Sequence, residues 1–384
     1  MDFDLTQEQQ MIRQAVREFA EKEIAPNARH VDETGEFPAA TFRKMGELGL
    51  MGIPFAEEFG GAGADNLSAA IAVEEVARAC GSTALAYSAH MGLGSAPIAL
   101  FGSQEQKRAF LKPAAQGKYI AAFGLTEPHA GSDAGATRTT ARLEGDEWVL
   151  NGAKMWITNA PVAGHIIFTA VTDPEKGKNG ISAIIVPGGT PGMSFGKHEP
   201  KMGLRGSVST AITLEDVHVP QQNLLGERGR GFTQFLQVLD GGRVGIGAMA
   251  IGLARAACEA ASAYAKERTA FGKPIGAYES ISNMIADMVT GIEAARLMVY
   301  QAAWLKDQGR PFAKHAAMAK LFASEVAEKT CRDAIQVFGG YGYSQEFPVE
   351  RIYRDQRLLT IGEGTSEILR VVIGRHVLGG FVGN

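Results

Sequence analysis

The chain has 384 residues, of which 45% are hydrophobic and 21% are charged, and its formal net charge at pH 7 is −4. This length exceeds what one hydrophobic core usually organises, so we expect two or three packed units. Charges of both signs are interspersed, which excludes the basic surface typical of proteins that bind nucleic acid or anionic lipid.

Residues 1–119 are predicted to form an all-α domain. Thr6 and Gln9 have the spacing of a capping box, and apolar residues recur along one helical face up to Ile24, before Pro26 ends the pattern. Ala-rich segments with Gly or Ser at their breaks predict further helices. These lie at about 38–49, 66–80 and 103–116.

Residues 120–231 are predicted to form a β-domain, because short β-branched runs replace the helical period. The dipeptides Gly145-Asp146 and Asn151-Gly152 have the composition of two-residue turns that close β-hairpins. Prolines fall where hydrogen-bonded ladders can end. We expect strands at 141–144, 147–150, 153–158, 165–172, 181–186 and 207–214, with such prolines at Pro187, Pro191 and Pro220.

Residues 232–384 return to a helical pattern rich in Ala, Met and Leu. Gly309-Arg310-Pro311 is a helix-to-helix turn, and Gly339-Gly340 ends a helix. Helices of this length can bury one another as a four-helix bundle. We expect them at 232–268, 278–308 and 312–337, with a shorter one from Ser366.

The cysteines give no sign of a disulfide or a zinc site, because Cys80, Cys258 and Cys331 stand far apart without a CxxC pair. Residues 1–10 lack the basic start and apolar run of a signal peptide, and no segment has a long enough uninterrupted apolar run to span a bilayer. We expect a bacterial cytoplasmic protein without membrane insertion; a processed mitochondrial matrix protein would have the same composition.

Glu363 stands between Gly362 and Gly364, and a carboxylate on so bare a backbone can approach a substrate closely. It is therefore the chain's best candidate for a catalytic base. The alternative is a helix start, with Thr365 or Ser366 as N-cap and an acidic residue favoured by the helix dipole. Most loop carboxylates are merely solvated, so this motif alone leaves both interpretations open.

Several common chemistries lack their signatures. No G-x-G-x-x-G follows a predicted strand, and the chain has no phosphate-binding P-loop, no G-x-S-x-G and no H-E-x-x-H. Nicotinamide binding in a Rossmann domain, P-loop hydrolysis, serine hydrolysis and a metal centre are therefore not expected.

Five segments, in order along the chain, carry a resemblance to the acyl-CoA dehydrogenase family, of the short- or medium-chain or short branched-chain type. Two of them look like the family's two signatures, and the order and spacing hold from about residue 3 to residue 376. The segments are 124–136 and 336–355, which match the signatures, and 154–159, 268–272 and 362–367.

The resemblance implies an α+β multidomain fold: an N-terminal helical domain, a central β-barrel domain and a C-terminal four-helix bundle. It also implies FAD as cofactor and oxidation of the Cα–Cβ bond of an acyl-CoA to the trans-2-enoyl-CoA. Electron-transferring flavoprotein would be the electron acceptor, and the protein would be a homotetramer.

Glu363 matches the base of many family members. It would abstract the Cα proton while hydride passes from Cβ to flavin N5, and burial beside an acyl chain would raise its pKa. Its backbone N–H would stabilise the thioester oxygen. Gly242 occupies the base position of a minority of members. Gly362 replaces a frequent Tyr, which would widen the pocket near Cα and make a short branched acyl chain conceivable.

The resemblance assigns cofactor contacts to three parts of the chain. Thr126 would bond the flavin edge, Ser132 would lie where pyrophosphate and CoA meet, and Arg268 would reach the FAD phosphates of a neighbouring subunit. The full set is Phe123, Leu125, Thr126, Ser132, Trp156, Ile157, Thr158, Arg268, Phe271, Gln336, Val337, Gly339, Gly340, Thr365, Ser366 and Glu367.

Several of these contacts also have a purely structural interpretation. Trp156 would be a core aromatic of the β-domain, Arg268 a solvated cation at a helix end, and Gly339-Gly340 a helix terminator. Glu279 stands where the family commonly has a Gln that helps to hold FAD, so that contact is in doubt.

Substrate contacts are assigned to Ser132, Asp240, Arg243 and Gly364. An i, i+3 helix ion pair is an equally good explanation of Asp240 and Arg243. Two other functions remain open: an acyl-CoA oxidase that passes electrons to oxygen, and a catalytically silent helical assembly protein that kept the architecture.

Overall fold

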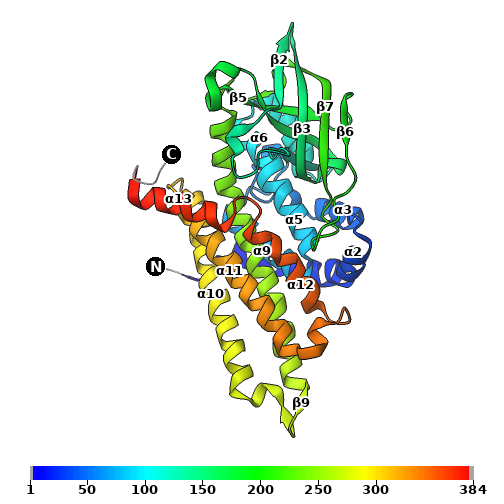
Figure 1. Cartoon of the computed structure of the whole chain (residues 1–384), viewed down its shortest axis with the longest axis vertical. Helices are drawn as coiled ribbons and strands as arrows, with labels where there is room; N and C mark the ends of the chain where they lie inside the picture. Colours follow the sequence, from blue (N-terminus) through cyan, green and yellow to red (C-terminus); the bar gives the residue numbers. More distant parts are fainter. Residues whose placement is uncertain (1–2, 380–384) are drawn as a thin grey trace.

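The computed structural model describes residues 3–379, so the outermost ends of the predicted first and last domains, 1–2 and 380–384, lie outside the described residues. A helical part, a sheet and a second helical part follow one another along the chain, as predicted. Figure 1 shows the sheet at the top of the molecule, above long helices that run to the opposite end.

The N-terminal part begins with α1 (Gln7–Phe19), and the predicted capping box is present, because the Thr6 and Gln9 side chains each accept a bond from the other's backbone. The predicted helix at 103–116 is instead two short helices joined by a π-helical turn. The other helices are α2 (Ala28–Thr34), α3 (Ala39–Glu47), α4 (Asn66–Ala79), α5 (Gly81–Ala89), α6 (Ala96–Phe101), α7 (Gln104–Gln106) and α8 (Lys112–Ala115).

The eight-stranded sheet has the order β6-β7-β3-β2-β4-β5-β8, with β1 paired in parallel to β4. Its apolar cluster is separate from the main core of the helices. The strands are β1 (Ile120–Gly124), β2 (Thr140–Glu144), β3 (Glu147–Thr158), β4 (Ala163–Val171), β5 (Ile181–Pro187), β6 (Met193–Phe195), β7 (Ser209–Pro220) and β8 (Leu224–Leu225).

One of the two predicted hairpin turns is confirmed and the other is wrong. β2 and β3 pair across Gly145-Asp146, with Glu144 opposite Glu147. At Asn151-Gly152, however, β3 continues, and the register shifts by a bulge. A Cβ at Gly152 would lie 2.6 Å from Thr139 Oγ1, so the glycine serves a close approach rather than a turn.

The C-terminal part is built around α9 (Gly231–Glu267), which packs against α4 and the later helices. The predicted ends of the three long helices are correct to within one residue. The remaining elements are α10 (Glu279–Asp307), α11 (Ala313–Phe338), α12 (Pro348–Gln356), α13 (Ser366–Leu378) and the ribbon of β9 (Thr269–Ala270) and β10 (Lys273–Pro274). One apolar cluster joins α1, α4 and α5 to α9, α10 and α11, so both helical parts share a core.

By length and composition α9 could cross a bilayer, which differs from our expectation that no segment would. The most apolar window of α9 is 72% buried inside the protein. The helix crosses the middle of the shared core in Figure 1, and that position accounts for its apolar composition.

Candidate active site

Glu363 lies in the loop between α12 and α13 with a backbone φ of +53°, a conformation that costs energy for a residue with a side chain. The loop directs its carboxyl group onto α9, where a Cβ at Gly242 would lie only 2.1 Å from Oε2. Oε2 is buried and has no hydrogen-bond partner among residues 3–379. Because Gly242 has no side chain, the Glu363 carboxylate fits against α9. Its Oε2 remains without a protein partner in the described structure and is available to a ligand.

Two cations face this carboxyl group. Burial raises the pKa of Glu363 to about 7, and the charges of Lys320 and Arg243 oppose that rise. Lys320, on α11, is fully buried, and its Nζ donates a 2.7 Å hydrogen bond to the Gly364 carbonyl. Burial also lowers the pKa of Lys320 to about 8. The carboxyl group thus titrates near neutral pH, the range in which a general base is most effective.

Arg243 and Asp240 form the ion pair that was one of the two predicted interpretations, with Nη1 donating to Oδ1 over 2.6 Å. The Arg243 side chain is only 6% exposed, and its Nε is buried without a partner in the described structure. A Cβ at Gly364 would lie 4.0 Å from Nη2. The ion pair therefore holds the Arg243 guanidinium close to the loop that carries Glu363. The ion pair and the predicted substrate contact are compatible interpretations of these two residues.

The start of α13 supports the helix-capping interpretation for one residue. Thr365 is the N-cap, since its Oγ1 accepts a 3.3 Å hydrogen bond from the Ile368 backbone. Ser366 Oγ is buried and has no partner among residues 3–379, whereas Glu367 is exposed. A ligand contact by these three residues stays a prediction.

The sheet brings a second group of predicted contacts together. The Phe123 ring stacks on Phe235 of α9 at 5.7 Å, and the Met155 backbone donates to the Thr126 carbonyl over 2.8 Å. Trp156 is 56% exposed with a φ of +61°, so its interpretation as a core aromatic is wrong. A strained, exposed indole next to Thr126 is suited to covering a flat ligand.

The neighbours of Trp156 divide between core and surface. Ile157 is buried in the sheet's core, while Thr158 is half-buried, with its Oγ1 3.5 Å from Ser209 Oγ. Leu125 is half-buried and Ser132 is exposed on the loop that follows β1.

A buried ion pair that the sequence did not reveal fixes this loop. Lys154 Nζ donates to Glu127 Oε1 and to the Thr169 carbonyl, both over 2.8 Å, and also to the Leu125 carbonyl over 3.2 Å. The Glu127 carboxylate also accepts bonds from the backbone of 138–139. Lys154 begins the segment 154–159, one of the five that carry the resemblance. A strand lysine normally points to solvent, however, so nothing in the sequence marked it as buried.

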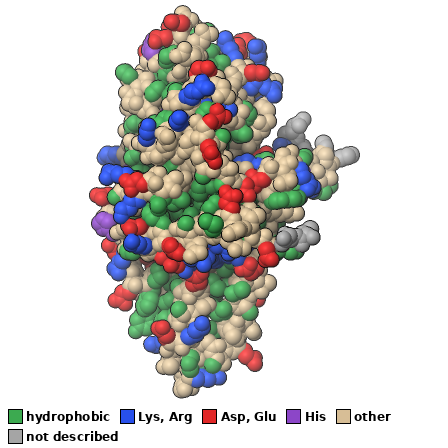
Figure 2. Space-filling model, turned by 180° about the vertical axis from the view of Figure 1, so that it is seen from behind, with side chains coloured by type: hydrophobic (Ala, Val, Ile, Leu, Met, Phe, Trp, Pro, Cys, Tyr) green, Lys and Arg blue, Asp and Glu red, His purple; other side chains and the backbone are tan. Residues whose placement is uncertain are grey.

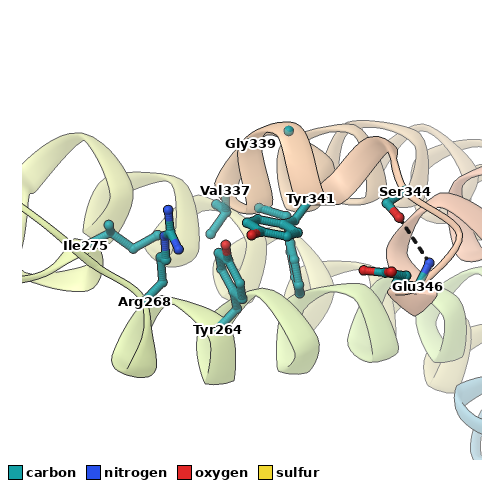
Figure 3. A pocket seen from close by; sticks show the side chains of 10 residues that line it. Tyr264, Arg268, Ile275, Val337, Gly339, Tyr341, Ser344 and Glu346 are labelled. Carbon is teal, nitrogen blue, oxygen red and sulfur yellow. Dashed lines mark hydrogen bonds between the residues drawn. The ribbon is translucent and has the colours of Figure 1, made fainter.

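Four of the remaining predicted contacts line a cavity of about 610 Å³ where the ends of α9 and α11 meet: Arg268, Val337, Gly339 and Gly340. Figure 3 shows Arg268, Tyr264 and Tyr341 around it, and the Arg268 guanidinium lies 5.6 Å over the Tyr341 ring. Gly339 and Gly340 each have open space where a Cβ would stand. Bare backbone beside an arginine is the chemistry that a phosphate group requires.

Other residues at this end are free to meet a partner. Phe271 has a φ of +49° and is 97% exposed, and Gln336 is exposed, whereas Val337 is buried. Glu279 is an exposed residue at the start of α10, and no hydrogen bond or ion pair involves its side chain within 3–379.

The residues around Glu363 and Gly242 lie far from the residues around Arg268 within one chain. Arg268 follows Gly242 by 26 residues of essentially continuous helix, a separation of about 39 Å. One extended dinucleotide cannot span that distance and also have its ring beside Glu363. The structure therefore assembles the predicted contacts into two half-sites at opposite ends of α9.

A second cavity of about 530 Å³ adjoins Gly242 and continues between α9, α4 and the end of α10. Its lining is mainly apolar, and it is large enough to receive an acyl chain. Among the described residues, no three His, Cys, Asp or Glu side chains are grouped closely enough to hold a metal ion.

Three family models match consecutive parts of this chain. The acyl-CoA dehydrogenase N-terminal domain matches residues 6–118, the middle domain 122–217 and the C-terminal domain 229–378. The chain is 58% identical to the probable acyl-CoA dehydrogenase YngJ of Bacillus subtilis and 49% identical to the short-chain specific acyl-CoA dehydrogenase of Clostridium acetobutylicum. Each alignment covers 98% of this chain and 100% of the relative.

Solved structures share the whole fold. A chain in a structure described as the electron transferring flavoprotein of Acidaminococcus fermentans is 47% identical, with a TM-score of 0.98, over 99% of this chain and 100% of that one. Butyryl-CoA dehydrogenase from Megasphaera elsdenii is 44% identical, with a TM-score of 0.97, over 98% and 100%. An acyl-CoA dehydrogenase of Bacillus anthracis complexed with FAD is 36% identical, with a TM-score of 0.93, over 98% and 68%.

These matches define the class of the protein as a three-domain oxidoreductase. The chain belongs to the acyl-CoA dehydrogenase family, so the predicted family, fold and enzyme class are confirmed. Members of this family are FAD enzymes, as the sequence predicted. The residues fit such a cofactor, because Glu363 has an unpartnered buried oxygen against α9 at one half-site, and bare glycines with Arg268 form the other.

Proposed function

We propose that this protein dehydrogenates a short acyl-CoA, straight or branched, to the trans-2-enoyl-CoA, with Glu363 as the base. The observation that carries the proposal is the buried, unpartnered Oε2 of Glu363 beside a cavity of about 530 Å³. The relatives described as short-chain specific and butyryl-CoA dehydrogenases support a short substrate.

The residues of the loop have separate tasks in this reaction. Glu363 takes the Cα proton, since its raised pKa makes it a competent base near neutral pH. No backbone hydrogen bond within 3–379 uses the Glu363 N–H, which leaves it free to donate to the thioester oxygen as negative charge develops there. Bound FAD supplies the oxidant that accepts hydride from Cβ. Lys320 holds the loop through the Gly364 carbonyl.

The cofactor site is completed between two chains in this proposal, because the two half-sites of one chain are about 39 Å apart along α9. A homotetramer is consistent with the exposed apolar side chains on α10 and α11, which favour association. Figure 2 shows hydrophobic side chains gathering on the reverse face of the molecule. The large exposed apolar side chains of α10 and α11 are Val289, Leu297, Trp304 and Phe322.

Electron-transferring flavoprotein is the proposed electron acceptor. The support is the solved structure described by that protein's name, which contains a chain 47% identical to this one. An oxidase would use oxygen instead and would release peroxide.

The test is anaerobic titration of the purified, FAD-loaded protein with straight and branched acyl-CoAs. We expect butyryl-CoA or a short branched acyl-CoA to bleach the flavin, and electron-transferring flavoprotein to restore its colour. A protein that binds FAD but is bleached by no acyl-CoA would contradict the dehydrogenase, and rapid peroxide formation would favour the oxidase.

A further inference from the structure

The apolar cavity next to Gly242 is lined by one half-buried amine that the reaction does not use. Lys306, in the last turn of α10, lines this cavity. Its Nζ lies 3.1 Å from the point where a Cβ of Gly241 would stand, so the bare backbone of α9 makes room for it. Lys306 is therefore directed at the helix that also carries Gly242.

This ammonium group has no protein partner. Within residues 3–379 no hydrogen bond or ion pair involves Nζ, and burial lowers the pKa of Lys306 although the neighbouring Asp307 opposes that shift. The Asp307 carboxylate is directed elsewhere, because it accepts bonds from the backbone N–H groups of Asn66 and Leu67 over 2.8 and 3.2 Å. Lys306 is half-buried and lines the cavity, so its unpartnered charge retains water or a polar ligand there.

The amine lies at a defined place relative to the base. Gly241 and Gly242 are successive residues of α9, so they point about 100° apart, and groups seated over them are separated by roughly 10 Å. An acyl chain with Cα at Glu363 fills that gap when it is butyryl. A hexanoyl or octanoyl chain must press its methylene groups against the ammonium and displace its water.

We propose that Lys306 sets the upper limit of acyl chain length, by placing a charge that rejects apolar chains longer than butyryl at the end of the cavity. This inference rests on the proposed acyl-CoA dehydrogenation. Burying a methylene group against an unpaired ammonium is unfavourable, because the charge loses water and gains no counter-charge. In hydrophobic pockets a single methylene changes specificity by about 10-fold or more.

The decisive variant is Lys306→Met, which keeps the length of the side chain and removes its charge. We expect the ratio of kcat/KM for octanoyl-CoA to that for butyryl-CoA to rise about 10-fold or more, with butyryl-CoA turnover changed less than about 3-fold. Lys306→Arg should keep the limit. Lys112→Met, which removes an exposed lysine on α8, should leave the ratio unchanged.

Binding gives a readout that needs no turnover. Calorimetry with the products crotonyl-CoA and trans-2-octenoyl-CoA should show that Lys306→Met tightens binding of the longer one alone, again about 10-fold. An unchanged preference in a folded, FAD-loaded Lys306→Met protein would overturn the inference. Should that variant fail to fold, Lys306→Gln, which is neutral and still polar, tests the same prediction by the same measurements.

Two other outcomes are informative. A wild-type protein that prefers an acyl-CoA with a terminal hydroxyl or carboxyl group over butyryl-CoA would make Lys306 a binding group, and the limit on chain length would be refuted. A wild-type protein that oxidises no acyl-CoA would refute the proposed function instead, while the product-binding comparison between wild type and Lys306→Met would still decide the role of Lys306.

Discussion

The two half-sites along α9, near Gly242 and near Arg268, differ in how enclosed they are. Near Gly242 the site is enclosed, and the charges of Lys320 and Arg243 are fixed around Glu363 by the chain's own packing. Near Arg268 the site is an open cavity bordered by Tyr341, and Phe271, three residues after Arg268, is 97% exposed. In the function that we propose, the base is organised within one chain and a second chain completes the nucleotide end.

The largest effect is expected at the enclosed end. Glu363→Gln removes the base but keeps the shape of the side chain, so turnover should fall about 10³-fold while FAD stays bound. Anaerobic flavin bleaching by butyryl-CoA measures the loss. Glu175→Gln, at an exposed position between β4 and β5, is the matched control. Bleaching at the wild-type rate in the Glu363 variant would place the base elsewhere.

The open end should show a loss of cofactor rather than of chemistry. Arg268→Ala removes the cation beside the two glycines, and losing a charge-assisted phosphate contact should weaken FAD binding about 30- to 100-fold. Dialysis followed by flavin absorbance measures the binding. Arg142→Ala, on the exposed edge of β2, should retain FAD. Equal FAD retention by both variants would remove Arg268 from the cofactor site.

The pH dependence tests the enclosed end without a mutation. Because the pKa of Glu363 is raised to about 7, the ionised base is the minor form below that pH and the major form above it. We expect kcat/KM to fall about tenfold for each pH unit below 7 and to level off above it. A flat profile between pH 5 and 8 would contradict a buried base with this pKa.

The smallest effect is expected from Lys320, whose charge faces Glu363. Lys320→Met removes a cation that favours the ionised form of Glu363, so the pKa of the base should rise and the pH profile should move upward by about one unit. Activity at pH 7 would fall only a few-fold, and raising the pH would restore it. A loss that no pH restores would mean that Lys320 acts mainly by holding the Gly364 carbonyl.

The sequence predicted the elements that have a clear period or a strong local signal. The ends of α9, α10 and α11 followed from their glycines and prolines, and the capping box at Thr6 from its spacing. α5 escaped prediction because all its residues are buried, so it shows no amphipathic period. The bulge at Gly152 was taken for a turn because Asn-Gly has the same composition in both.

The residues of the candidate site also differ in whether the sequence could identify them. Glu363 and its glycines are adjacent in sequence, so a local motif could identify them. Lys320 and Lys306 are lysines on long helices, where most lysines point to solvent. Their positions depend on helix packing, which brings Gly364 to one and Gly241 to the other, and no local pattern encodes that packing.

The enclosed carboxyl group also affects how firmly the protein folds. Its pKa of about 7 in the folded chain lies above the value of 4.5 that it has when exposed, so unfolding is opposed most strongly at acidic pH and this advantage is lost as pH rises through 7. A shift of this size corresponds to a free energy of unfolding lower by roughly 3 kcal/mol in alkaline solution than in acid. The enclosed carboxyl group proposed as the base therefore lowers the stability of the protein at alkaline pH.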